Sequence, residues 1–173
     1  MATLNLQVGA NADDGYVNYG AQVLFDGNTQ WCGATFYGCF ARFTVPNIPQ
    51  GSTIQSAYLV STCDTSCSDI TARTNIFAED ADDAAAPTSY AGFIGIIETS
   101  AKVAWDFIGS WTLNSEYSSP NIATIIQEII NRPGWSAGQH ICLFWVDDDS
   151  NVLAYRRAYA HNQDPTKAMK LEI

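Results

Sequence analysis

The sequence predicts a single antiparallel β-sandwich domain, jelly-roll-like, that spans residues 1–173 and carries one amphipathic helix. Several stretches alternate apolar and polar residues with a period of two, which is typical of half-buried strands. Turn residues recur at intervals of roughly ten positions, as in sandwiches, and no regular alternation of helices and strands is present. Because 47% of the 173 residues are hydrophobic, the chain has enough material for one core.

Both ends of the chain are predicted to be strands. Apolar residues alternate with polar ones over residues 3–8, and they do so again over residues 169–173. The apolar positions are Leu4, Leu6, Val8, Met169, Leu171 and Ile173. Each strand therefore has one face that packs on a core and one face that meets water.

Four internal stretches are also predicted to be strands. Residues 41–45 and 70–76 alternate, which indicates one packed face. Residues 53–63 and 140–146 are more continuously apolar, which favours central strands covered on both faces. Turn chemistry separates these strands at residues 14–15, 26–28, 46–51 and 147–151.

The one strong helical pattern covers residues 120–131. Its isoleucines follow the spacing i, i+3, i+4, i+7 and i+8, so they form one stripe that should lie on the sheet. They are Ile122, Ile125, Ile126, Ile129 and Ile130. Ser119 is the predicted N-cap with Pro120 at the first helical position, and Pro133-Gly134 ends the helix.

Charge excludes several classes of partner. Eight Lys and Arg oppose eighteen Asp and Glu, giving a net charge of −10. Such a surface repels nucleic-acid phosphates and anionic membranes, so we expect neither as a partner. The first residues have no basic segment followed by an apolar one, and no apolar run approaches the roughly eighteen residues of a membrane span. We therefore expect no signal peptide and no transmembrane helix.

The five cysteines form two close pairs and a singleton. Cys32 with Cys39, and Cys63 with Cys67, are candidate disulfides in an oxidising medium and thiols otherwise. Cys142 lies in an apolar run and is interpreted as a small buried hydrophobe. A zinc site is disfavoured, because the seven-residue step and the lack of a nearby histidine do not fit its usual ligand spacing.

The sequence contains a serine-hydrolase motif, but the elements around it are in the wrong order. Residues 134–138 read Gly-Trp-Ser-Ala-Gly and are followed by Asp147 and His161 in the hydrolase order. The chemistry needs a strand entering the serine turn and a helix leaving it, whereas here a helix enters and a strand leaves. We therefore expect no catalytic residue and no enzymatic activity.

Acidic residues gather at residues 13–14, 80–83 and 147–149. We interpret these runs as solvated loop charges, with a structural Ca²⁺ in one of them as the alternative, since loop carboxylates suit that ion. No spacing singles out a carboxylate pair for glycoside hydrolysis. We expect no other cofactor and no other metal.

The aromatic residues fall into two groups. Trp31 and Tyr37 lie in the Cys32–Cys39 region and are candidates for contact with a glycan or a partner subunit, because flat rings stack on sugars and are enriched at interfaces. Tyr155 and Tyr159, on a late strand, offer a similar surface. The other four tryptophans fall in strands or beside the helix and should fill the core. They are Trp105, Trp111, Trp135 and Trp145.

Three passages, residues 40–58, 101–111 and 119–135, carry a resemblance to a known family. They resemble a β-sandwich domain that recurs in tailed-phage structural proteins and in bacterial secreted surface proteins, similar to the DNRLRE and carbohydrate-binding-module-like sandwiches. The most specific stretch is residues 127–135, which read QEIINRPGW. This stretch contains the end of the predicted helix, the Pro-Gly pair that terminates it and a tryptophan of the core. It therefore predicts a structural role rather than a catalytic or binding one.

The resemblance implies a non-enzymatic structural protein on the virion surface of a tailed bacteriophage. Virion proteins assemble in the host cytoplasm and leave by lysis, so they need no signal peptide. A small acidic sandwich with no coiled-coil shaft fits a capsid decoration or cement protein, which would contact the capsid or other virion proteins and form a homo-oligomer. The alternative is an extracellular carbohydrate-binding module, or the receptor-binding domain of a tail fibre or adhesin.

Overall fold

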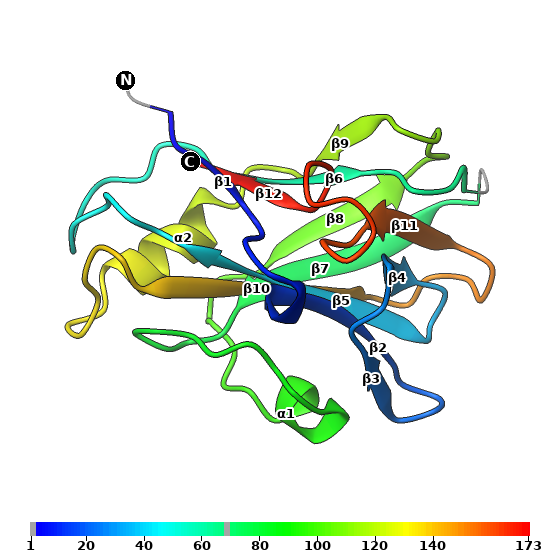
Figure 1. Cartoon of the computed structure of the whole chain (residues 1–173), viewed down its shortest axis with the longest axis horizontal. Coiled ribbons are helices and arrows are strands. Elements are labelled where there is room, and N and C mark those ends of the chain that lie inside the picture. The colour runs from blue at the N-terminus through cyan, green and yellow to red at the C-terminus, as the bar shows by residue number, and fades with distance from the viewer. Residues whose placement is uncertain (1–2, 68–69) are drawn as a thin grey trace.

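The computed structural model describes residues 3–67 and 70–173 and consists of two antiparallel β-sheets that form a sandwich (Figure 1). The smaller sheet has the order β1-β12-β6-β9, and the larger follows β11-β4-β5-β10-β7-β8 with β2 and β3 attached beside β5. The predicted fold class is therefore confirmed. The strands are β1 (Asn5–Gln7), β2 (Asp14–Asn18), β3 (Val23–Phe25), β4 (Thr29–Gly33), β5 (Tyr37–Thr44), β6 (Tyr58–Thr62), β7 (Ala72–Ala78), β8 (Val103–Ile108), β9 (Glu116–Ser118), β10 (His140–Asp147), β11 (Tyr155–Tyr159) and β12 (Lys170–Glu172).

The two predicted end strands are confirmed, and they pair with each other. Leu6 of β1 lies opposite Leu171 of β12, which in turn lies opposite Leu59 of β6. All three leucines contact the core between the sheets. The strand predicted over residues 53–63 is shorter than expected, because only Tyr58–Thr62 belongs to the sheet.

Strand β10 is covered on both faces, as its continuous apolar sequence predicts. Ile141, Leu143 and Trp145 point into the core between the two sheets. Cys142 and Phe144 point to the opposite face, where they pack in a second apolar cluster with Phe93. Phe93 belongs to α1 (Tyr90–Ile94), a short helix whose N-terminus is capped by Ser89 and which the sequence pattern did not predict.

The predicted helix exists as α2 (Ala123–Ile130), and its isoleucine stripe is buried in the core. Its start differs from the prediction. Ser119 is not the N-cap, since its hydroxyl accepts a hydrogen bond from the Leu59 amide at 3.0 Å. The helix begins three residues later, where the Asn121 side chain accepts from the Ala123 amide at 2.9 Å. No helix of the described residues is long and apolar enough to cross a membrane.

The turn after α2 binds two loops together. The Arg132 guanidinium forms ion pairs with Asp80 and Asp82, the latter at 2.7 Å. Gly134 packs so closely beside Asp82 that a Cβ atom there would collide with the carboxylate. The indole N–H of Trp135 donates to the Ile48 carbonyl at 2.9 Å. Residues 132–135 therefore have a structural role, because they fix the helix end to the 46–51 and 79–83 loops.

Candidate binding site: an aromatic face

Five aromatic rings from five strands gather on one surface, which we call the aromatic face. Trp31 of β4 is at its centre, with ring centroids 5.0 Å from both Tyr37 of β5 and Tyr155 of β11. Tyr16 of β2 lies 6.2 Å from Tyr37 and stacks on Phe25 of β3 at 4.9 Å. Four of the rings are half-buried and Phe25 is exposed, so the cluster reaches solvent.

Strand pairing brings these rings together. Strands β4 and β11 are antiparallel, and Gly33 lies opposite Tyr155 while also pairing with Tyr37. Gly33 has φ of +94°, and a Cβ atom at this position would collide with the Ala154 carbonyl. Glycine is therefore required here, because it alone permits both the backbone conformation and the close approach of the two strands. The rings of β5 and β11 flank Trp31 as a result.

A cation is fixed against the central ring. The guanidinium carbon of Arg157 lies 4.6 Å from the Trp31 ring centroid, which is cation–π geometry. The Arg157 Nη2 atom also donates to Asp64 Oδ2 at 2.9 Å. The Asp64 side chain is only 1% exposed, and its second oxygen has no hydrogen-bond partner among the described residues. This buried carboxylate holds Arg157 in place from beneath the surface.

The polar ends of the central rings are open. Within the described chain, the Trp31 indole N–H and the hydroxyls of Tyr37 and Tyr155 form no hydrogen bond, although all three residues are half-buried. Burial raises the pKa of Tyr16, and the neighbouring Tyr37 raises it further, so this hydroxyl stays protonated and can donate. Aromatic residues with an unused polar group are suited to contact a partner.

Exposed apolar residues also occur in two loops that adjoin the strands of the aromatic face. Phe36 is 42% exposed in the β4–β5 turn, and Val152 and Leu153 are 57% and 61% exposed in the loop before β11. Hydrogen bonds join the two loops, since the Thr35 hydroxyl donates to the Ser150 carbonyl at 2.7 Å. Thr35 has φ of +65°, an unfavourable conformation for a β-branched residue. Such strain is concentrated at functional sites in proteins.

Only part of this site is predictable from the sequence. Trp31 and Tyr37 were predicted as contact residues, and Tyr155 as a further surface ring, and the structure brings these three into contact. Tyr16 and Arg157 were missed. The pattern Gly-Tyr-Val-Asn-Tyr at residues 15–19 does contain a strand-like alternation, but nothing in the sequence indicates that its tyrosine meets Trp31.

All five cysteines are free thiols in the structure. Cys63 and Cys67 both donate to the Thr65 carbonyl at 3.0 Å, and burial raises the pKa of Cys63 to about 11. Burial, together with the neighbouring Cys39, also raises the pKa of Cys32. Neither candidate disulfide is formed here, so bridging in an oxidising medium stays a prediction. Buried protonated thiols are poor nucleophiles.

The structure does not join the residues of the hydrolase motif. Ser136 is exposed in the turn between α2 and β10, and its amide donates to the Gln139 side chain at 2.6 Å. The His161 ring contacts the Asn11 side chain at 2.6 Å, and its backbone amide donates to Asp14. Ser136 and His161 thus have different hydrogen-bond partners, and neither is a partner of the other.

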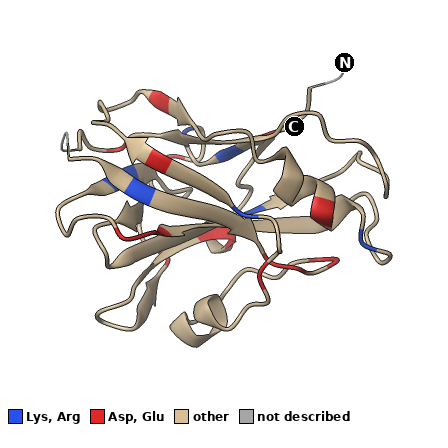
Figure 2. Ribbon diagram, turned by 180° about the vertical axis from the view of Figure 1, so that it is seen from behind, with Lys and Arg blue, Asp and Glu red and all other residues tan. Residues whose placement is uncertain are grey.

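Several acidic residues are more constrained than predicted. The prediction of solvated loop charges is wrong for Asp14, which is 2% exposed in β2. Asp13 pairs with Arg42 and Asp83 with His140, each at 2.7 Å, in addition to the two partners of Arg132. Figure 2 shows that Asp and Glu occur on strands, on α2 and in loops rather than on one face. Within residues 3–67 and 70–173, no group of three or more His, Cys, Asp or Glu side chains could hold a metal ion.

In comparisons with known proteins, no family model matches the chain. No curated protein matches it in sequence either.

Proposed function

We propose that this chain is a non-enzymatic structural protein of a tailed-phage virion surface, a capsid decoration or cement protein, and that it docks through the aromatic face. The docking role rests on one observation: Trp31 is surrounded by Tyr37, Tyr155 and Arg157 at the surface. Tryptophan, tyrosine and arginine are the residue types that contribute most to binding energy at protein interfaces. The phage setting rests on the resemblance of residues 40–58, 101–111 and 119–135.

The geometry favours a protein partner over a sugar. The Trp31 ring is tilted by 41° from Tyr37 and by 37° from Tyr155, and Arg157 lies over it, so it presents little open flat surface for stacking. The loops that adjoin these strands carry the exposed Phe36, Val152 and Leu153, which are apolar residues of the kind found at the core of an interface. A virion protein, or a second copy bound around a symmetry axis, meets these requirements.

Binding to virions tests this function. Purified protein mixed with capsids that lack it should co-sediment with them, and Trp31→Ala should lower the affinity at least about tenfold, as expected for a central interface residue. Ile97→Ser is a matched control, because Ile97 is 74% exposed and does not belong to the aromatic face. Absence of the protein from purified particles, or equal binding of Trp31→Ala and wild type, would contradict the proposal.

Glycan binding is the second candidate function, in an extracellular module or a receptor-binding domain. The unused indole N–H of Trp31 and the hydroxyls of Tyr37 and Tyr155 favour it, since sugar hydroxyls need such partners beside a ring. A glycan array should then show reproducible binding that is lost in both Trp31→Ala and Tyr37→Ala. Binding of no glycan, together with capsid binding, would leave the protein-docking role alone.

A further inference from the structure

The larger sheet ends in an open edge strand, β8. Because the sheet follows the order β11-β4-β5-β10-β7-β8, this strand pairs with β7 on one side and with no strand of the described chain on the other (Figure 1). An edge of this kind presents unpaired backbone groups, and proteins usually shorten it or cover it. β8 has six residues, so it is not protected by its length.

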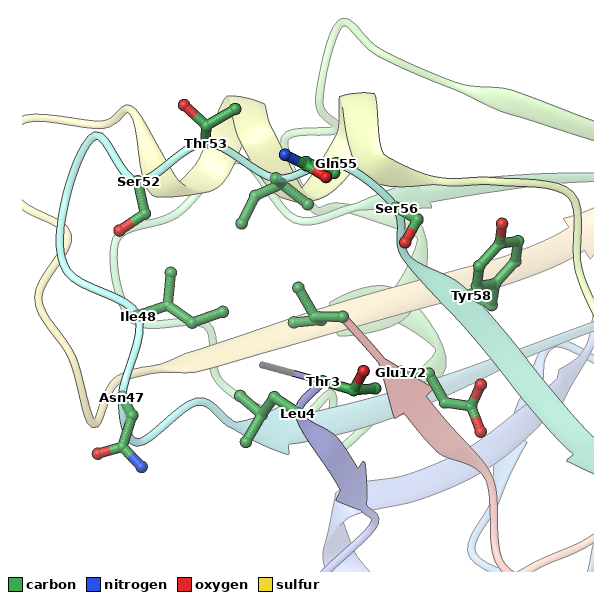
Figure 3. Close-up of a pocket in the computed structure, with 12 residues that line it drawn as sticks. Thr3, Leu4, Asn47, Ile48, Ser52, Thr53, Gln55, Ser56, Tyr58 and Glu172 are labelled. Atoms are coloured by element: carbon green, nitrogen blue, oxygen red, sulfur yellow. The ribbon is translucent and has the colours of Figure 1, made fainter. Parts of the chain in front are cut away.

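The other edge strands of the described chain are short or joined to a neighbour. β1, β3 and β9 have three residues each. Beside β1 lies a groove of about 490 Å³ that Leu4 and Ile48 line (Figure 3). β11 is joined to the end of β6, because Ala158 forms a β-bridge with Cys63. Among the described strands, β8 therefore has the longest open edge.

The fold closes this edge on both sides of a short central stretch. Before β8, the Glu128 carboxylate of α2 accepts from the amides of Ser100 and Ala101, each at 2.7 Å. Near its end, a bulge interrupts the pairing of β7 with β8, and Phe107 has φ of +55°. A bulge disrupts the regular ladder, so it also limits pairing on the outer side. The open stretch is residues 102–106.

The backbone at the centre of this stretch faces outward. The Trp105 carbonyl accepts from the Thr74 hydroxyl at 2.9 Å, so it is turned toward β7. Since successive residues of a strand direct their N–H and C=O groups to opposite edges, those of Ala104 point away from β7. They form no hydrogen bond with a turn or loop within residues 3–67 and 70–173. Ala104 therefore offers one donor and one acceptor to another strand.

The side chains of the open stretch are self-complementary in charge. Val103 and Trp105 pack against the core. The alternate positions Lys102, Ala104 and Asp106 are exposed. An antiparallel strand of the same sequence, centred on Ala104, places an aspartate opposite Lys102 and a lysine opposite Asp106. This spacing argues for a second copy of the chain as the partner, because one sequence supplies both charges of each pair.

Both charged side chains can take part in this contact. Asp106 forms no ion pair with any described residue. Lys102 pairs with Glu98 and lies 5.1 Å from the Phe77 ring centroid, yet its side chain is 46% exposed. A contact of one strand is smaller than a standard stable interface, so the association is expected to be weak.

We propose that two copies of this chain form a dimer by antiparallel pairing of their β8 strands about a two-fold axis at Ala104. The two Ala104 residues exchange two backbone hydrogen bonds, and Lys102 of each copy lies opposite Asp106 of the other. Opposite charges at such positions are stabilising and like charges are destabilising. A two-fold contact uses the same patch on both copies, as this one does. The inference goes beyond docking through the aromatic face and does not rest on it.

Sedimentation equilibrium of the full chain tests the dimer through its charges. In Lys102→Glu and in Asp106→Lys the homodimer has two like-charge pairs, so we expect association at least about tenfold weaker than in wild type. A mixture of the two variants has opposite charges at both pairs and should associate at least about tenfold more tightly than either variant alone. Both positions are exposed, and thermal melts verify that the variants fold.

Two further measurements separate strand pairing from general repulsion. Asp106→Lys lowers the net negative charge, so general repulsion predicts tighter association, whereas pairing of β8 predicts weaker association. Lys102→Asp combined with Asp106→Lys keeps the net charge and restores both pairs, so it should dimerise as wild type does. Hydrogen exchange at Ala104 should slow at least about twofold as the wild-type protein is concentrated, because this amide gains a partner.

Three results would overturn the inference. They are a wild-type monomer at all concentrations up to about 1 mM, association of Asp106→Lys that equals or exceeds that of wild type, and a mixture of the two variants that associates no more tightly than its components. Trp31→Ala should dimerise as wild type does, and no capsid enters the measurement. A failure of this inference is therefore distinguishable from a failure of the aromatic face.

Discussion

Two aromatic clusters in this molecule have similar ring spacing and different surroundings. In the core, Trp145 lies 4.9 Å from Trp105 and 5.8 Å from Trp111. At the surface, Trp31 lies 5.0 Å from each of Tyr37 and Tyr155. Trp145 is 1% exposed and its indole N–H donates to the Thr74 hydroxyl at 2.7 Å, whereas the indole of Trp31 has no acceptor in the described chain.

The difference shows that ring packing alone does not identify a binding site. Both clusters gain the contact energy that aromatic pairs provide. In the core, Thr74 also donates to the Trp105 carbonyl at 2.9 Å, so the indole N–H of the central Trp145 and the hydroxyl that accepts from it are both used within the fold. At the aromatic face the indole N–H of the central Trp31 has no acceptor in the described chain, the ring is half-buried rather than buried, and the charge of Arg157 lies over it. Exposure of the central ring with its unused donor, rather than ring packing, indicates a function.

The largest effect should come from the core cluster. Trp145→Ala removes a fully buried ring that contacts Trp105 and Trp111 and leaves the Thr74 hydroxyl without its donor. We expect the free energy of unfolding to fall by about 3–5 kcal/mol, as for other large-to-small core substitutions. Urea unfolding measures this. A loss below about 1 kcal/mol would mean that the two clusters do not differ as described.

The second effect concerns the strand that carries Tyr16. Asp14 begins β2, and burial raises its pKa to about 7, although the His161 amide and the Gln30 side chain oppose the shift. Because the folded state holds this proton more tightly than the unfolded state, its contribution to stability is full below about pH 4 and is lost as the pH rises to about 7. Asp14→Asn should therefore be more stable than wild type at pH 8, by on the order of 3 kcal/mol.

The pH dependence distinguishes titration of the Asp14 carboxyl from a change in stability that is the same at every pH. At pH 4 the carboxyl of Asp14 is protonated in the folded state, so wild type and Asp14→Asn should have nearly equal stability. Urea unfolding at pH 4, 6 and 8 gives the comparison, and Asp106→Asn, at an exposed position of β8, is the control. The same difference between Asp14→Asn and wild type at all three pH values would refute the role of this proton.

The sequence predicted the core better than the surface site, for a physical reason. Core positions repeat with the period of their own strand or helix, so Ile125 and Ile129 of α2, or Leu171 of β12, can be identified locally. The aromatic face depends on pairing between distant segments, since Trp31 and Tyr155 are brought together by the β4–β11 register. A local pattern contains no information on that register.

Errors at the level of single elements have similar causes. Ser119 has the residue type and position of an N-cap, but a tertiary hydrogen bond to Leu59 takes its hydroxyl. The run Asp13-Asp14 predicted solvated loop charges, but Asp14 begins β2, is 2% exposed, and accepts a hydrogen bond from the distant His161 amide. In each case the residue type suits the predicted local role, but an interaction with a residue distant in the sequence determines what the side chain does.

A smaller effect should follow when the support beneath the aromatic face is weakened. Asp64→Asn replaces the buried carboxylate that accepts from Arg157 with a neutral amide. We expect a loss of about 1–2 kcal/mol in the free energy of unfolding, because hydrogen bonds between charged groups are the stronger ones. Capsid binding should weaken too, since Arg157 is no longer fixed over Trp31. Unchanged binding in Asp64→Asn would show that the position of Arg157 does not matter.

The smallest effect on stability should come from Trp31 itself. Trp31→Phe keeps a ring between Tyr37 and Tyr155, so we expect the free energy of unfolding to change by less than about 1 kcal/mol. Urea unfolding measures this change.

The exposure of the Trp31 ring can be measured by fluorescence. Among the five tryptophans Trp31 is the half-buried one, while the other four are at most 8% exposed. Acrylamide should therefore quench a fraction of the wild-type fluorescence that is absent in Trp31→Phe. Bound capsid should protect this fraction in wild type, because docking covers the ring. Quenching that is unchanged by the substitution would mean that the ring is not open to solvent, and the contrast between the two clusters would then be lost.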